Sequence, residues 1–178
     1  MDQGRSTWRQ NSVLSNIICL IRPKLAPDAK LFSDLPGFLA PRGGSIPPHI
    51  LVTNQKPDVV IINESLGEII IFELTCPWDG NIARSHTFKE EEYAPLVADL
   101  SQRFTCHHFS IEISVRGQIS KENKGRLKAF TYRACSDAKP VLKSLVPILS
   151  KSALLASFSI FAARAEPSWV SPPLLNTY

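Results

Sequence analysis

The chain has 178 residues, of which 44% are hydrophobic and 20% are charged, and its formal net charge is +4. This length and apolar content fit one globular domain with an appended tail. Four scattered cysteines show no paired spacing, which argues against a disulfide framework or a zinc motif and favours a reduced intracellular compartment, nuclear or cytoplasmic. No signal peptide opens the chain. The most apolar window, 141–163, contains Lys143, Lys151 and Pro147, so it predicts one or two buried helices and no membrane contact.

The first half of the chain predicts a helix, a short strand and a strand hairpin. Apolar residues recur at near-helical spacing over 6–21, which predicts a helix. A short strand is expected at 30–34, and a Pro/Gly-rich loop then runs to Pro48. Two runs rich in β-branched residues flank a turn over 57–75 and predict strand, turn, strand. Both runs are apolar on both faces, so helices should cover the hairpin on both sides.

A helix is expected next, near 81–104, with Pro95 kinking or restarting it. Lys89 lies in the centre of its apolar stripe. A lysine in that position is unusual, and two interpretations stand: the side chain extends to the edge of the sheet, or it serves a site.

The second half predicts one more strand and two more helices. Clean alternation over 109–116 predicts a strand whose apolar residues point inward, so that Glu112 faces the other way. A basic helix is expected at about 120–135 with Ser120 as its N-cap, and further helix across 139–165. The order predicts an α/β fold with a mixed sheet between helices. We expect an α/β domain over 1–135 and a helical extension with a Pro-rich tail, packed on it, over 136–178.

Two carboxylates stand at matching positions of the predicted hairpin. If residues 64–67 form the loop, Asn63 faces Glu68, and counting outward brings Asp58 opposite Glu73. Directly opposed residues on one sheet face have Cβ atoms only about 4.5–5.5 Å apart. Two acids that close in an apolar setting call for a cation, and hard oxygen ligands suit Mg²⁺ or Mn²⁺. The alternative is that Asp58 caps the strand and Glu73 pairs with a surface lysine, and a one-residue slip would separate the acids.

The element order and several short motifs together resemble a known nuclease family. The predicted order is a helix, three strands, a helix and a strand, with acids on the second and third strands. This order resembles the PD-(D/E)XK nuclease core. A closer resemblance over most of 30–170 is to the restriction-endonuclease-like domain that follows the reverse transcriptase in some non-LTR retrotransposons. The motifs that carry it are Asp34-Leu35-Pro36-Gly37-Phe38, Lys56-Pro57-Asp58, Glu73-Leu74-Thr75-Cys76-Pro77-Trp78 and Ile113-Ser114-Val115-Arg116-Gly117.

The resemblance implies metal-dependent nicking of DNA at an integration site, exposing a 3′ end that primes reverse transcription. Asp58 and Glu73 would hold Mg²⁺ or Mn²⁺, and a lysine would position the attacking water. Thr75 occupies the position of the family's lysine, and Lys56 or Lys89 could replace it; we favour Lys89. The first helix also lacks a glutamate found in some members, and the strand phase of Glu112 makes it a poor substitute.

The charge distribution has two interpretations: ordinary solvated faces, which charge counts alone favour, or a surface for a polyanionic partner. Residues 57–115 carry three basic and ten acidic side chains, whereas 116–151 carry nine basic and two acidic ones. A basic segment beside an acidic centre could hold DNA, or the RNA of a retroelement. The predicted phosphate contacts are Arg116, Lys121, Lys124 and Lys128. Two further hypotheses remain: a catalytically inactive nucleic-acid-binding remnant of a retroelement polyprotein, and a decayed copy with no function.

Overall fold

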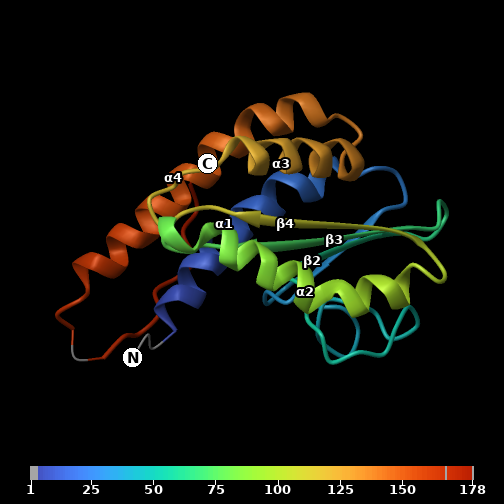
Figure 1. The fold of residues 1–178 in the computed structure, drawn as a ribbon, viewed down its shortest axis with the longest axis horizontal. Helices are drawn as coiled ribbons and strands as arrows, with labels where there is room; N and C mark the ends of the chain where they lie inside the picture. The colour runs from blue at the N-terminus through green and yellow to red at the C-terminus, as the bar shows by residue number, and fades with distance from the viewer. Residues whose placement is uncertain (1–3, 167, 178) are drawn as a thin grey trace.

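The structure is a computed structural model that describes residues 4–166 and 168–177. A four-stranded mixed sheet lies between two layers of helices (Figure 1). The strands are β1 (Lys30–Ser33), β2 (Val59–Asn63), β3 (Glu68–Thr75) and β4 (Thr105–Glu112), in the spatial order of the chain. β1 pairs antiparallel with β2, and β2 pairs antiparallel with β3, whereas β3 and β4 pair parallel. The predicted α/β class with a mixed sheet is confirmed.

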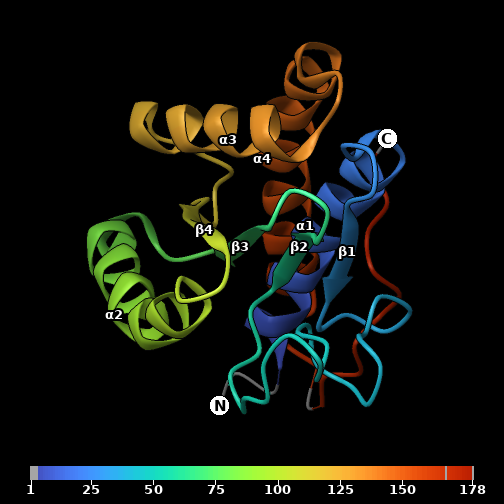
Figure 2. The same cartoon turned by 90° about the vertical axis from the view of Figure 1, so that its right-hand side faces the viewer.

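The α-helices are α1 (Arg5–Ile21), α2 (Ile82–Leu100), α3 (Lys121–Ala134) and α4 (Ala138–Ala162), and short 3₁₀ turns lie at Arg22–Lys24 and Asp79–Asn81. α1, α3 and α4 cover one face of the sheet, and α2 covers the other (Figure 1). α3 and α2 both extend beyond β4, the last strand (Figure 2). Helices therefore cover the hairpin on both sides, as its two apolar faces predict.

Side chains that alternate along β2 and β3 belong to two separate hydrophobic cores, one on each face of the sheet. One set of side chains, including Ile61 and Phe72, packs against the layer of α1, α3 and α4, and Phe72 contacts Phe130 with ring centroids 4.4 Å apart. The other set, including Ile69 and Ile71, packs against α2. Every residue of β2 is buried. Burial on both faces fixes the strand register, because a slip of one residue would exchange the two sets.

Several element boundaries differ from the sequence expectations. The last strand runs from Thr105 to Glu112, four residues earlier than predicted at each end. α2 continues as one helix through Pro95. Its buried residues, Tyr93, Leu96 and Leu100, all lie in its second half. Ser120 caps α3 as predicted, accepting a hydrogen bond from the amide of Asn123 at 3.1 Å.

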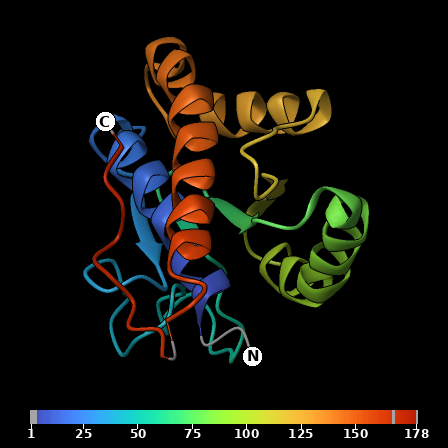
Figure 3. The same cartoon turned by 90° about the vertical axis from the view of Figure 1, so that its left-hand side faces the viewer.

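The C-terminal segment is closely joined to the rest of the fold. α4 is one continuous helix whose buried side chains, such as Leu145 and Leu149, belong to the same core as α1. The tail that follows runs back along α1 (Figure 3), where the Trp8 indole N–H donates to the Pro172 carbonyl at 2.8 Å. The Trp8 and Trp169 rings also meet edge to face, 5.5 Å apart.

By length and composition, α4 is also apolar enough to cross a membrane, although 28% of its most apolar stretch is buried in the fold. It has one core face and one exposed apolar face, on which Leu154, Phe158 and Phe161 lie. The expectation of buried helix over 141–163 therefore holds for the core face of α4 and not for its exposed face.

Candidate active site

The pairing of β2 with β3 brings the two predicted carboxylates together. Asn63 pairs with Glu68 and Val59 with Phe72, so the next position outward places Asp58 beside Glu73. This is the register predicted from a four-residue loop. The amide of Asp58 donates to Glu73 Oε1 at 2.9 Å, and the amide of Leu74 donates to Asp58 Oδ2 at 2.8 Å. Each carboxylate thus accepts a hydrogen bond from the backbone of the opposite strand.

The strand that carries Asp58 is also held from β1. The Ser33 hydroxyl donates to the Asp58 carbonyl at 2.6 Å and accepts from the Leu35 amide at 3.2 Å. Gln10 of α1 reaches the Asp58 carboxylate from the other side, at 3.3 Å from Oδ2. Neighbouring elements therefore fix both the backbone and the side chain of this acid.

Both carboxylates are difficult to ionise. Burial raises the pKa of Asp58 to about 6, against the lowering effect of the Leu74 amide and the charge of Lys89. Burial and then the neighbouring charge of Asp58 raise the pKa of Glu73, which is 1% exposed, to about 8. Removal from water disfavours a charged group, and a like charge nearby adds to the effect. At neutral pH, without a bound cation, Glu73 therefore keeps its proton and Asp58 carries the negative charge of the pair.

Lys89 is the cation that reaches this pair. Its Nζ lies 3.4 Å from Glu73 Oε2 and 2.8 Å from Glu92 Oε2 on the next turn of α2. Burial opposes its positive charge, but the hydrogen bond to Glu92 and the charges of Glu73, Glu92 and Asp58 leave the pKa of Lys89 raised. The lysine is therefore fully protonated near neutral pH. Its place in the apolar stripe of α2 is explained by this contact.

Lys56, the other predicted lysine, points elsewhere. β2 begins at Val59, and the segment before it leaves the sheet. The exposed side chain of Lys56 lines a separate cavity with Arg42, and its carbonyl accepts from the Tyr93 hydroxyl at 3.3 Å. The structure brings together Asp58, Glu73 and Lys89, and leaves Lys56 outside this group.

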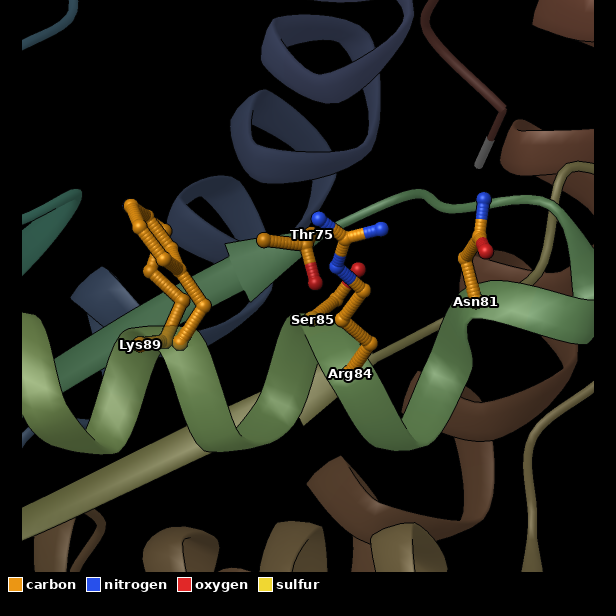
Figure 4. A pocket seen from close by; sticks show the side chains of 6 residues that line it. Thr75, Asn81, Arg84, Ser85 and Lys89 are labelled. Atoms are coloured by element: carbon orange, nitrogen blue, oxygen red, sulfur yellow. The ribbon is translucent and has the colours of Figure 1, made fainter.

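A cavity of about 390 Å³ opens beside Lys89, between the end of β3 and the first half of α2 (Figure 4). Thr75 and Lys89 line it together with Arg84, Ser85 and Phe88. Figure 4 shows the Arg84 side chain rising from α2 toward the end of β3. The Thr75 hydroxyl is buried and has no hydrogen-bond partner among the described residues. Thr75 therefore faces the same cavity as Lys89.

A second cavity of about 460 Å³ adjoins the first, and the two share Asn81 and Ser85 as lining residues. Arg5 and Arg9 of α1 lie on its wall, and Arg9 donates to the Cys76 carbonyl at 3.1 Å. The Trp78 side chain, 68% exposed, lies on the same wall. An arginine-lined passage with an exposed aromatic ring suits a polyanionic strand.

Sequence reasoning misplaced Glu112 relative to the site. The parallel register pairs Thr75 with Glu112 and Glu73 with Ser110, so Glu112 shares the sheet face of Glu73. Glu112 does face away from Ile111, as predicted, but that face is the one that α2 covers and that Glu73 shares, so the strand phase does not separate Glu112 from Glu73. Glu112 Oε1 lies 3.1 Å from His86 Nδ1 and accepts from the Ser110 hydroxyl at 2.9 Å.

Sequence reasoning also missed Gln10 and Tyr93 as neighbours of the carboxylates. Both contacts depend on how two helices pack on opposite sides of the hairpin, which no local pattern specifies. The one sequence signal was a polar residue, Gln10, close to the apolar stripe of the first helix.

The predicted phosphate-binding residues lie apart from the carboxylates. Lys121, Lys124 and Lys128 are exposed along α3, which packs on the face of the sheet opposite α2. Arg116 forms an ion pair with Asp79, so part of its charge is already offset. α3 therefore presents its basic surface on the other side of the sheet from Lys89.

The donor set fits a divalent cation that prefers oxygen. Among residues 4–166 and 168–177, no group of three or more histidine, cysteine, aspartate or glutamate side chains is arranged to hold a metal ion. Mg²⁺ typically needs only one or two protein carboxylates, with water and substrate phosphate completing its shell. Asp58 and Glu73 provide such a pair, and a bound cation would favour their ionised forms over the protonated forms that burial favours.

A comparison with protein-family models finds no match to this chain, and a comparison with curated proteins finds none either.

Proposed function

We propose that this chain is a metal-dependent DNA endonuclease domain of the kind associated with non-LTR retrotransposons, nicking target DNA for integration. The observation that carries the proposal is the contact of Lys89, which lines an open cavity, with Glu73, which the register of the hairpin holds beside Asp58. The buried Glu73 and the half-buried Asp58 lie side by side with raised pKa values, and perturbed carboxylates of this kind cluster at functional sites.

The reaction is hydrolysis of a phosphodiester bond. The oxygen of water bonds to phosphorus, the bond between phosphorus and the 3′ oxygen breaks, and one water proton passes to that oxygen. The products are a 3′ hydroxyl and a 5′ phosphate, and the second proton goes to solvent. When bound, Mg²⁺ or Mn²⁺ supplies a Lewis acid that polarises the phosphate and lowers the pKa of a water molecule.

The protein residues then have separate roles. Asp58 and Glu73 hold the cation, and the opposite-strand amides keep their carboxylates in place. Lys89 adds a positive charge on the cavity side of Glu73, where it offsets the charge that develops on the phosphate. Arg5 and Arg9 lie further along the passage, where they can contact phosphates on one side of the cut.

The test is nicking of supercoiled plasmid by the purified chain with Mg²⁺, with Mn²⁺ and with EDTA. Asp58→Asn and Glu73→Gln preserve side-chain shape and are expected to abolish cutting, whereas the exposed Glu91→Gln serves as the matched control on α2. Metal-independent nicking, or nicking that survives in both amide variants, would rule the carboxylate pair out as the active site. Thermal melts of each variant separate lost chemistry from lost folding.

The second candidate function is a catalytically inactive nucleic-acid-binding module. The exposed lysines of α3 favour it, because they form a basic surface that lies apart from the carboxylates. Binding through phosphate contacts must weaken as salt rises, since released counterions drive it. Salt-dependent DNA binding by a chain that melts cooperatively but never nicks would favour this function over the first.

A further inference from the structure

A polar cavity on the loop side of β2 has no place in the function proposed above. It has a volume of about 410 Å³ and is formed by two loop segments, 42–46 and 53–56. Arg42 and Lys56 contribute two positive charges to its lining, and no acidic side chain lines it. Neither cation has a side-chain hydrogen bond or ion pair within the part of the chain that the structure describes. The cavity therefore concentrates uncompensated positive charge.

A buried hydroxyl adds a hydrogen-bonding group to this charge. Ser45 is 0% exposed, and its Oγ has no hydrogen-bond partner among the described residues. A buried polar atom without a partner destabilises a fold, and such atoms in native structures call for a specific explanation. Since Ser45 also lines the cavity, an acceptor bound there would satisfy its hydroxyl.

The backbone before Ser45 has an unusual conformation. Arg42, Gly43 and Gly44 have φ values of 72°, 89° and 74°, three left-handed residues in succession. Positive φ is uncommon for a non-glycine residue such as Arg42. The turn is closed by its own backbone: the Gly43 amide donates to the Ala40 carbonyl at 2.9 Å, and the Ala40 amide donates to the Gly44 carbonyl at 2.8 Å. These hydrogen bonds hold the backbone that places Arg42 and Ser45 on the wall of the cavity.

The cavity is tied to the helix turn that carries Lys89. The Gln55 side-chain amide donates to the Glu92 carbonyl at 2.7 Å, and the Tyr93 hydroxyl donates to the Lys56 carbonyl at 3.3 Å. Lys56 is also only two residues from Asp58. The cavity beside Thr75 lies along residues 81–89 of α2, whereas this one lies by Glu92 and Tyr93, one turn further on.

We propose that Arg42, Lys56 and the Ser45 hydroxyl form a phosphate-binding site for the strand that is cut at Asp58 and Glu73, gripping it on the side away from Arg5 and Arg9. This identification of the ligand rests on the proposed function. The chemistry recognised is a phosphate group, which can come from a phosphodiester or from free phosphate. A planar guanidinium, an ammonium and a hydroxyl together suit a tetrahedral oxyanion.

The first arm of the test measures the binding of inorganic phosphate to the protein, by calorimetry and by the rise in melting temperature that phosphate causes. Arg42→Gln and Lys56→Gln should each weaken phosphate binding about tenfold, and Lys30→Gln, an exposed lysine on β1, is the matched control. Ser45→Ala should melt no lower than the parent protein without phosphate, because it removes an unpartnered hydroxyl, and should lose most of the phosphate-induced rise. Phosphate binding that is absent, or equal in parent and variants, would overturn the site.

The second arm measures binding of a short single-stranded oligodeoxynucleotide to Glu73→Gln protein, with and without Lys56→Gln. About tenfold weaker binding supports a phosphodiester ligand, whereas unchanged binding with lost phosphate affinity would overturn it in favour of free phosphate. Because neither arm measures cutting, the two proposals fail separately. Weaker binding in both arms, from a protein that never nicks plasmid, supports the phosphate site and contradicts the endonuclease.

Discussion

Replacing Glu73 by glutamine should stabilise the folded protein at neutral pH. The pKa of Glu73 in the folded chain is about 8, above its ordinary value of 4.5. Between about pH 4.5 and pH 8 the folded chain therefore keeps a proton that the unfolded chain has already released. Stability is therefore lost as pH rises through this window. A tenfold change in proton affinity corresponds to about 1.4 kcal/mol. At pH 5 the raised pKa of Glu73 therefore lowers the free energy of unfolding by less than about 1 kcal/mol. The cost at pH 7 is about 3 kcal/mol by the same relation.

Glutamine resembles the protonated acid in shape, and its carbonyl can still accept the Asp58 amide. For a chain of this size, 1 kcal/mol corresponds to about 2–4 °C in melting temperature. Glu73→Gln should therefore melt about 6–12 °C higher than the parent at pH 7 in EDTA, and nearly equally at pH 5. Scanning calorimetry at the two pH values measures this, with the exposed Glu91→Gln as the control.

Added Mg²⁺ should raise the melting temperature of the parent at pH 7 and leave that of Glu73→Gln almost unchanged. A cation at a hundred times its dissociation constant stabilises by about 2.7 kcal/mol. A variant that melts at or below the parent at both pH values would refute the reasoning, because Glu73 would then be neither desolvated nor repelled by Asp58.

Three further predictions concern other parts of the molecule. Lys89→Ala should abolish plasmid nicking while the Mg²⁺-induced rise in melting temperature persists, and adding Thr75→Lys should restore part of the cutting; unchanged nicking by Lys89→Ala removes that lysine from the site. Ser120→Ala should lower the free energy of unfolding by about 1 kcal/mol in urea, because it removes the N-cap of α3. Replacing the exposed lysines of α3 by glutamine should reduce the slope of log binding constant against log salt concentration by about 0.9 for each phosphate that is no longer neutralised. An unchanged slope would place the DNA elsewhere. These lysines are Lys121, Lys124 and Lys128.

The hairpin could be predicted from the sequence because local signals agree there. Two β-branched runs flank a four-residue loop, and Gly67 has φ 63°, as the turn requires. Loop length sets the register, and the register alone places Asp58 beside Glu73. Lys89 could be identified because a lysine inside an apolar stripe needs a partner. Local patterns were therefore enough for the three residues that converge.

The last strand was placed four residues late because its first half has no apolar alternation. Residues 105–108 include two adjacent histidines, and they become strand by pairing with β3 from Glu68 onward. The strand ends at Glu112, before a turn at Gly117, where a Cβ would lie 2.3 Å from the Ser150 carbonyl oxygen. Pairing with β3 sets the limits of the strand, and a helix more than thirty residues away constrains the turn that follows. The face of Glu112 and the position of Lys56 depended on the same long-range contacts.

The crossed hydrogen bonds of the carboxylate pair determine how this hairpin can evolve. Because each acid anchors the opposite strand, apolar replacements would break a bond that the fold needs, whereas Asp58→Asn and Glu73→Gln would keep an acceptor in place. The amides would also relieve the electrostatic penalty at neutral pH. A lineage under selection for folding alone should therefore drift toward the amides, since stabilising changes at functional sites are held back by function. The proposed metal-binding role would require both acids, and both are present in this chain.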